Sequence, residues 1–154
     1  MEIDTGVHTM RVRVELSGLT ANTTASHIHG PVLVAGGNAG VITPVPSFPG
    51  FPAGVTNGTY DHTLPASWNP TFVVNNGGTT ASAEVALAAA LSTGRAYWNI
   101  HTMAFPGGEI RGFLTPPVTG GKNLKITTNS IDLAWDPPRP SRPCPARPQA
   151  PPMP

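Results

Sequence analysis

Apolar and polar residues alternate along the first part of the chain and predict an antiparallel strand. Over residues 7–16, every second position from Met10 to Leu16 is apolar, and the positions between them carry Arg or Glu. Successive side chains of a strand point to opposite faces, so this segment has one buried and one solvated face. Further strands are predicted at residues 25–30, 41–42, 59–64, 96–102 and 109–115.

One segment departs from this alternation and predicts a helix over residues 80–92. Ser82 is placed to cap the helix and Gly94 to end it. Its expected apolar stripe consists of Val85, Leu87, Ala88 and Leu91. Many short strands, turns of Gly and Pro and one short helix predict an all-β fold, either an immunoglobulin-like or Greek-key β-sandwich or a barrel.

Composition excludes several classes of function. Charged residues make up 11% of the chain and the net charge is +1, so no basic surface for nucleic acid or an anionic membrane is expected. No apolar run is long enough to span a bilayer, and no leader pattern precedes the first strand. The chain has 1 cysteine, Cys144, so no internal disulfide can form. Nucleophile motifs and paired acids are missing, which makes an enzyme the less favoured interpretation.

The amino-acid composition changes near the C-terminus, where proline becomes the most frequent residue. Nine of the 19 prolines follow Asp136, and residues 139–154 are expected to be a disordered proline-rich tail. Residues 1–116 are expected to form a β domain. Residues 117–138 carry two further strand patterns, which we interpret as a separate fragment.

Three of the five histidines lie in the short segments 27–30 and 99–102, which otherwise have the pattern of buried strand, and they are the main candidates for chemistry. His27 and His29 are two positions apart and therefore point to the same face, about 6–7 Å apart by strand rise. His101 lies in a second strand and joins them if the two strands are neighbours. Three imidazoles can hold copper or zinc, with His62 as the candidate fourth ligand. The alternative is a polar network in which the imidazoles bond to strand carbonyls, Asn99 or Thr102.

Two charged residues that follow His101 in the sequence, Glu109 and Arg111, are further candidates for this site. Glu109 and Arg111 stand two positions apart, so a regular strand would place them on one face. They can orient a histidine, or they can form an ion pair that stabilises the hairpin; the second interpretation is favoured.

Several blocks of residues, taken together, resemble the CHRD domain, a module named after the extracellular protein chordin. The similarity covers about residues 16–115. The blocks are LT at 19–20, HIHGP at 27–31, GV at 40–41, GRAYWNIHT at 94–102 and FPGGEIRG at 105–112. The resemblance implies a secreted, all-β, immunoglobulin-like module and does not supply a reaction.

A weaker resemblance concerns residues 116–138, which are similar to the first two strands of a fibronectin type III domain. The matching blocks are LKI at 124–126, SIDLAW at 130–135 and DPP at 136–138. A type III sandwich needs about seven strands, so this segment alone cannot bury a core. Its apolar strands are candidates for adding to an exposed sheet edge.

Three functions remain open at this point. The first is an extracellular, non-enzymatic binding or structural module whose polar centre is the histidine face and whose partner is an unidentified extracellular protein or matrix component. The second is a copper or zinc protein that uses His27, His29 and His101, with redox activity as an option. The third is a matrix or filament subunit that self-associates through the C-terminal strand segment.

Overall fold

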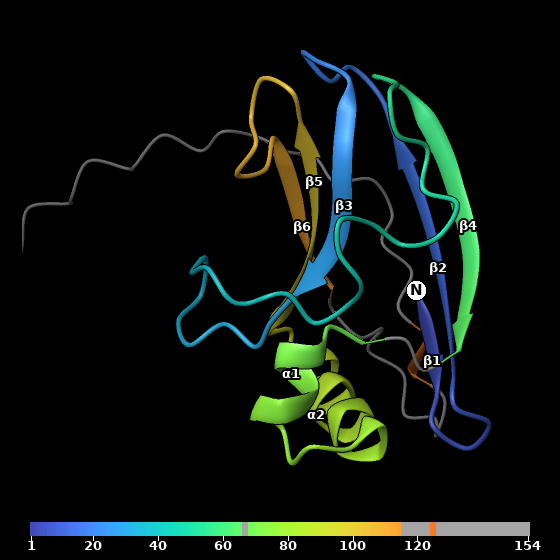
Figure 1. Ribbon diagram of the computed structural model, residues 1–154, viewed down its shortest axis with the longest axis vertical. Coiled ribbons are helices and arrows are strands. Elements are labelled where there is room, and N and C mark those ends of the chain that lie inside the picture. Colours follow the sequence, from blue (N-terminus) through green and yellow to red (C-terminus); the bar gives the residue numbers. More distant parts are fainter. Residues whose placement is uncertain (66–67, 115–123, 126–154) are drawn as a thin grey trace, which may run out of the picture.

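The computed structural model is a sandwich of two antiparallel sheets with helices at one end (Figure 1). It describes residues 1–65, 68–114 and 124–125. One sheet has the order β4-β2-β1-β7 and the other the order β3-β5-β6. The predicted all-β sandwich is confirmed. The strands are β1 (Glu2–Asp4), β2 (Thr9–Leu16), β3 (Thr23–His29), β4 (Gly58–Pro65), β5 (Ala96–Thr102), β6 (Ile110–Leu114) and β7 (Leu124–Lys125).

The alternation predicted for β2 is confirmed. Met10, Val12 and Leu16 are buried between the sheets, and Arg11 and Arg13 are exposed on the other side. β2 pairs with β4 along its whole length, and the exposed residues Arg13 and Glu15 lie opposite the exposed residues Asp61 and Thr59.

The core between the sheets includes an aromatic group assembled from three parts of the chain. Trp98 of β5 stacks on Phe48 with ring centroids 4.8 Å apart, and Tyr60 of β4 packs against both rings. Phe48 belongs to the long segment between β3 and β4, where a strand was predicted at residues 41–42 and the structure has an isolated bridge between Val41 and His29. That segment therefore supplies part of the core, since Ile42 and Phe48 are almost completely buried.

Two helices close one end of the sandwich. The predicted helix is confirmed as α2 (Thr80–Ser92), and a short helix α1 (Pro70–Asn75) precedes it. α1 was not predicted, although its start has a recognisable signal: Asn69 caps it by accepting a hydrogen bond from the Thr71 amide, and Pro70 takes the first helical position. No helix in the described ranges has the length and apolarity needed to cross a membrane.

Two details of the α2 prediction were wrong. Thr79 is the N-cap, and Ser82 is the third helical residue, which returns a hydrogen bond in a capping box. Val85 is 68% exposed, whereas the buried positions are Ala83, Glu84, Leu87, Ala90 and Leu91. Apolar residues occur on every side of this alanine-rich helix, so the sequence pattern did not single out the face that packs.

β7 extends the first sheet by pairing with β1, Glu2 opposite Lys125 and Ile3 opposite Leu124. The rest of the expected type III fragment and the proline-rich tail lies outside the described residues. The division into residues 1–116, 117–138 and 139–154, and self-association through the C-terminal segment, stay predictions.

Candidate metal site

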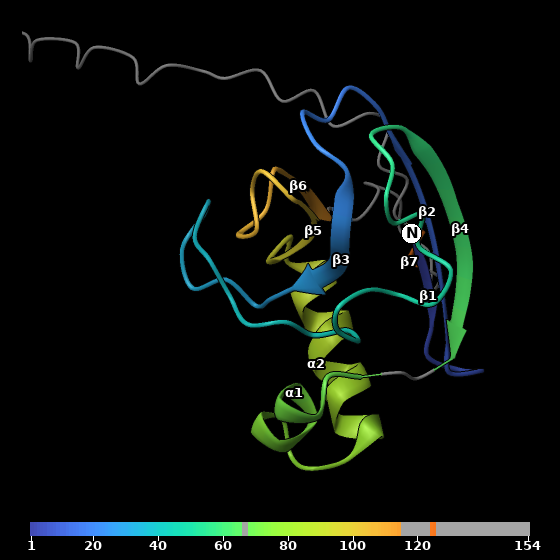
Figure 2. The same ribbon diagram turned by 45° about the horizontal axis from the view of Figure 1, so that its top comes forward.

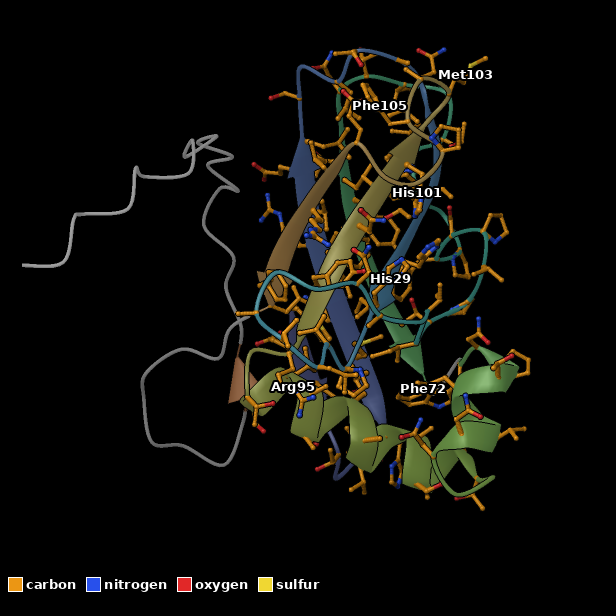
Figure 3. The ribbon with its side chains drawn as sticks, turned by 90° about the vertical axis from the view of Figure 1, so that its left-hand side faces the viewer. His29, Phe72, Arg95, His101, Met103 and Phe105 are labelled. Atoms are coloured by element: carbon orange, nitrogen blue, oxygen red, sulfur yellow. The ribbon has the colours of Figure 1, made fainter. Side chains whose placement is uncertain are left out.

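Strand pairing brings the three histidines together. β3 and β5 are antiparallel neighbours in which Ala25 lies opposite His101, His27 opposite Asn99 and His29 opposite Tyr97. These alternate positions share the outer face of the sheet, because Trp98 and Ile100 on the other face enter the core. His29 and His101 are labelled on this face in Figure 3.

The imidazole rings are close enough to share one ligand. The ring centroid of His27 lies 4.7 Å from that of His29 and 4.6 Å from that of His101. The Nε2 atoms of His27 and His101 are 3.0 Å apart, and one ring nitrogen from each of the three residues falls within 4.8 Å of the others. Among the described residues this is the one group of three or more His, Cys, Asp or Glu side chains with such spacing.

Backbone carbonyls hold the three rings in one tautomer. The Nδ1 atoms of His27, His29 and His101 lie 2.9, 2.8 and 2.7 Å from the carbonyl oxygens of Pro46, Ala39 and Pro106. A carbonyl only accepts, so each Nδ1 carries the proton and donates it. Each Nε2 therefore keeps its lone pair, which is the form in which an imidazole binds a metal.

The surroundings favour the neutral imidazole. Burial, and then the neighbouring His29 and His101, lower the pKa of His27 to about 4 against the opposing effect of its bond to the Pro46 carbonyl. Burial also lowers the pKa of His29, and Arg111 adds to that shift. Near neutral pH, His27 and His29 are accordingly uncharged.

Two of the lone pairs are in an unfavourable position as they stand. In the tautomer set by the carbonyls, the Nε2 atoms of His27 and His101 face each other at 3.0 Å without a proton between them. The Nε2 of His29 is buried, with no hydrogen-bond partner among the described residues. A cation at the meeting point of the three atoms would satisfy all of them, because each offers a lone pair.

Asn99 lies beside this meeting point and is itself held in place. Its Nδ2 donates to His101 Nε2 at 3.1 Å and to the Gly107 carbonyl at 3.4 Å. Its side chain packs against Gly108, where an added Cβ would overlap the amide. Asn99 is only 6% exposed, so the donor is part of the interior of the site.

Arg111 fastens the loop that covers the site. Its guanidinium donates to the carbonyls of Gly36 and Gly37 and to Asn38 Oδ1, at 2.7, 3.3 and 2.8 Å. The next residue of this loop, Ala39, provides the carbonyl for His29. Figure 2 shows the segment between β3 and β4 passing over the side of β3 that faces away from β2 and β4.

Tyr97 is the residue of this site for which the sequence suggested no role. Its ring stacks on His29, with centroids 4.9 Å apart and planes 3° apart, and the Arg111 guanidinium carbon lies 5.1 Å from the centroid of the Tyr97 ring. The Tyr97 hydroxyl also accepts from the Ala39 amide at 3.4 Å. The signal in the sequence was position, because Tyr97, Asn99 and His101 alternate on one strand face.

The favoured ion pair between Glu109 and Arg111 was wrong. Glu109 accepts from the Thr20 amide and from Thr102 Oγ1, each at 2.7 Å, and the backbone bond from Thr20 is the main cause of its lowered pKa. Glu109 precedes the first residue of β6, so it does not follow the strand alternation that would align it with Arg111. Thr102 was also misplaced in the histidine network, since its fully buried side chain faces Glu109.

The remaining two histidines lie elsewhere. His62 is in β4 of the other sheet, opposite Val12, and its side chain is outside the described set, so its role as fourth ligand stays a prediction. His8 is 66% exposed, and its Nδ1 lies 2.8 Å from Glu84 Oε2 of α2.

The family model of the CHRD domain matches residues 1–114. The chain belongs to the CHRD family. The match extends the similarity noted in the sequence to the first residue, so β1 and β2 are part of the CHRD domain. No curated protein and no solved structure matched the chain. Membership of the CHRD family supports, at a coarse level, a binding module of extracellular type.

Proposed function

We propose that this CHRD domain is an extracellular, non-enzymatic module that binds one copper or zinc ion through His27, His29 and His101. One observation carries the proposal: three Nδ1 atoms donate to carbonyls, so three Nε2 atoms keep their lone pairs, in three residues whose ring nitrogens come within 4.8 Å of one another. Metal-binding histidines commonly donate their second ring nitrogen to a carbonyl in this way.

The spacing of the ligands suits an ion of this size. Two nitrogens bound to one zinc ion at about 2.0–2.1 Å each lie roughly 3.3 Å apart in a tetrahedral site. The pair at 3.0 Å already fits, and the widest pair, no more than 4.8 Å apart, needs to contract by at most about 1.5 Å. Imidazole suits both copper and zinc, and no thiolate or carboxylate among the described residues joins the three histidines to separate the two metals.

A polar hub without metal is the competing interpretation. It leaves the Nε2 of His27 only 3.0 Å from the Nε2 of His101, whose lone pair accepts from Asn99, unless a proton bridges the two rings. The low pKa of His27, about 4, opposes that proton at neutral pH. A metal ion bound by both Nε2 atoms removes the repulsion between their lone pairs and requires no proton on the buried ring of His27.

Metal analysis tests the proposal directly. The chain, purified without a histidine tag, is dialysed against copper or zinc and then against buffer, and its metal content is measured beside His29→Ala. His8→Ala is the matched control, since it removes an exposed histidine outside the site. We expect one metal ion per chain in the wild type and the control.

The His29→Ala variant should lose at least 100-fold in affinity for that metal ion, since one of three ligands is gone. Wild-type protein that retains no metal, or His29→Ala that retains as much as the wild type, would refute the proposal. Circular dichroism of both variants checks that the fold is kept.

A further inference from the structure

The electrostatics of the site suggest that a metal ion does not bind alone. The three histidines bring no negative charge, and no described carboxylate or thiolate joins the group. Arg111 adds positive charge near His29, because its guanidinium lies over Tyr97, which stacks on His29. A divalent ion in this site would keep its full charge in surroundings that solvate it poorly.

Asn99 supplies a donor that loses its acceptor when a metal binds. Its Nδ2 now donates to the lone pair of His101 Nε2 at 3.1 Å. That lone pair is the one a metal ion would take. Asn99 is only 6% exposed, so water cannot readily replace the lost acceptor. Its N–H is then left facing the metal position and needs a new acceptor there.

Asn99 cannot easily turn away to find another acceptor. Its second N–H points to the Gly107 carbonyl, and the Gly108 backbone lies so close that even one added carbon would overlap the amide. The Arg111 guanidinium, which donates to Gly36, Gly37 and Asn38, can only donate and so offers Asn99 no acceptor. The position beside His101 therefore offers one directed N–H donor, that of Asn99.

We infer that the fourth ligand of the metal is a small monovalent anion, such as chloride or hydroxide, which receives a hydrogen bond from Asn99. The inference rests on the proposed metal binding and deepens it. Three protein ligands leave one position open in a four-coordinate site, and a negative ligand there offsets charge that the protein leaves uncompensated. A water molecule would fill the position without offsetting the charge.

Azide is the probe for this anion. The full chain, loaded with one equivalent of Cu²⁺ in chloride-free buffer at constant ionic strength, is titrated with sodium azide while the azide-to-copper charge-transfer absorption is recorded. Asn99→Ala is compared with Asn75→Ala, which changes an exposed asparagine in α1. Copper content is measured in every sample, and the wild-type titration is repeated with added chloride.

We expect saturable azide binding in the wild type and in Asn75→Ala, with an apparent Kd that rises linearly with chloride. In Asn99→Ala the azide Kd should rise about tenfold while copper stays bound, because the donor to the anion is lost. If Asn99→Ala does not fold, Asn99→Asp keeps the size of the side chain. Its carboxylate should abolish azide binding and leave copper in place.

The outcomes separate the two proposals. Protein that holds copper but shows no azide band, or no competition by chloride, overturns the anion site and leaves the metal site standing. Equal azide affinity in the wild type and the Asn99 variant overturns the role of Asn99. Protein that holds no copper overturns the proposed function itself, and the anion site with it.

Discussion

Gly108 is the position where one added methyl group should do most damage to the histidine site. Its φ is +118°, and a Cβ built there would overlap Asn99 Oδ1 and lie 2.6 Å from Nδ2 and 2.9 Å from Cγ. Real Cβ atoms do not approach neighbours so closely, so Asn99 would have to move. The substitution Gly108→Ala therefore acts on the neighbouring strand as well as on its own backbone.

The expected loss of stability has two parts. Forcing a residue other than glycine into this backbone region costs about 1–3 kcal/mol. Displacing Asn99 breaks its bonds to His101 Nε2 and to the Gly107 carbonyl, each of which contributes about 0.5–1.5 kcal/mol. Together these changes should lower the free energy of unfolding by about 4 kcal/mol.

Two other glycines serve as controls. Gly50 also has a positive φ, +78°, but a Cβ there meets nothing within 4 Å, so Gly50→Ala should cost only the backbone part, about 1–2 kcal/mol. Gly107 neighbours Gly108 and has open space with no positive φ, so Gly107→Ala should change stability by less than about 0.5 kcal/mol.

Urea unfolding of the metal-free proteins, followed by tryptophan fluorescence, measures all three variants. The midpoint should shift while the slope stays constant, which indicates a change in stability alone. If Gly108→Ala loses no more than Gly50→Ala, the overlap with Asn99 has no energetic consequence. Gly108 would then have no part in shaping the site.

Three further predictions concern other parts of the molecule. In metal-free protein, the free energy of unfolding should rise with pH between about 4 and 6.5, by up to about 3 kcal/mol, because the pKa of His27 is lower in the folded than in the unfolded chain, which therefore binds the proton more tightly. Urea midpoints of the wild type and His27→Gln at pH 5 and 7 test this prediction. Equal pH dependence in the two proteins would contradict it. Arg111→Lys keeps the positive charge but loses the planar guanidinium whose two nitrogens bond to the loop at residues 36–38, so the metal affinity measured by chelator competition should fall about tenfold. Unchanged affinity would show that this loop does not position His29. Thr79→Ala removes one half of the capping box and should lower the free energy of unfolding in urea by about 1 kcal/mol. Thr79→Ser keeps the hydroxyl and should retain most of the wild-type stability. An equal loss in Thr79→Ser would rule out the missing cap as the cause.

Much of the fold followed from local pattern. The alternation over residues 7–16 set which face of β2 is buried, and the same rule placed Trp98 and Ile100 inward and Tyr97, Asn99 and His101 outward. A strand has two faces and a repeat of two residues, so a few apolar positions are enough to fix the orientation of all the others. α2 lacked this clarity, because alanine-rich helices offer several apolar faces and only packing selects one.

The histidine site was only half determined by the chain itself. The i, i+2 spacing put His27 and His29 on one face, but the pairing of β3 with β5 set the register that brings His101 within 3.0 Å of His27. Two of the carbonyls that hold the rings, those of Pro46 and Ala39, come from the long segment between β3 and β4, and the third, that of Pro106, comes from the turn between β5 and β6. The alternation along a strand shows to which face of the sheet a side chain points. Which groups that side chain meets depends on which strands and loops pair with its own strand, and this pairing is set only in the folded sandwich.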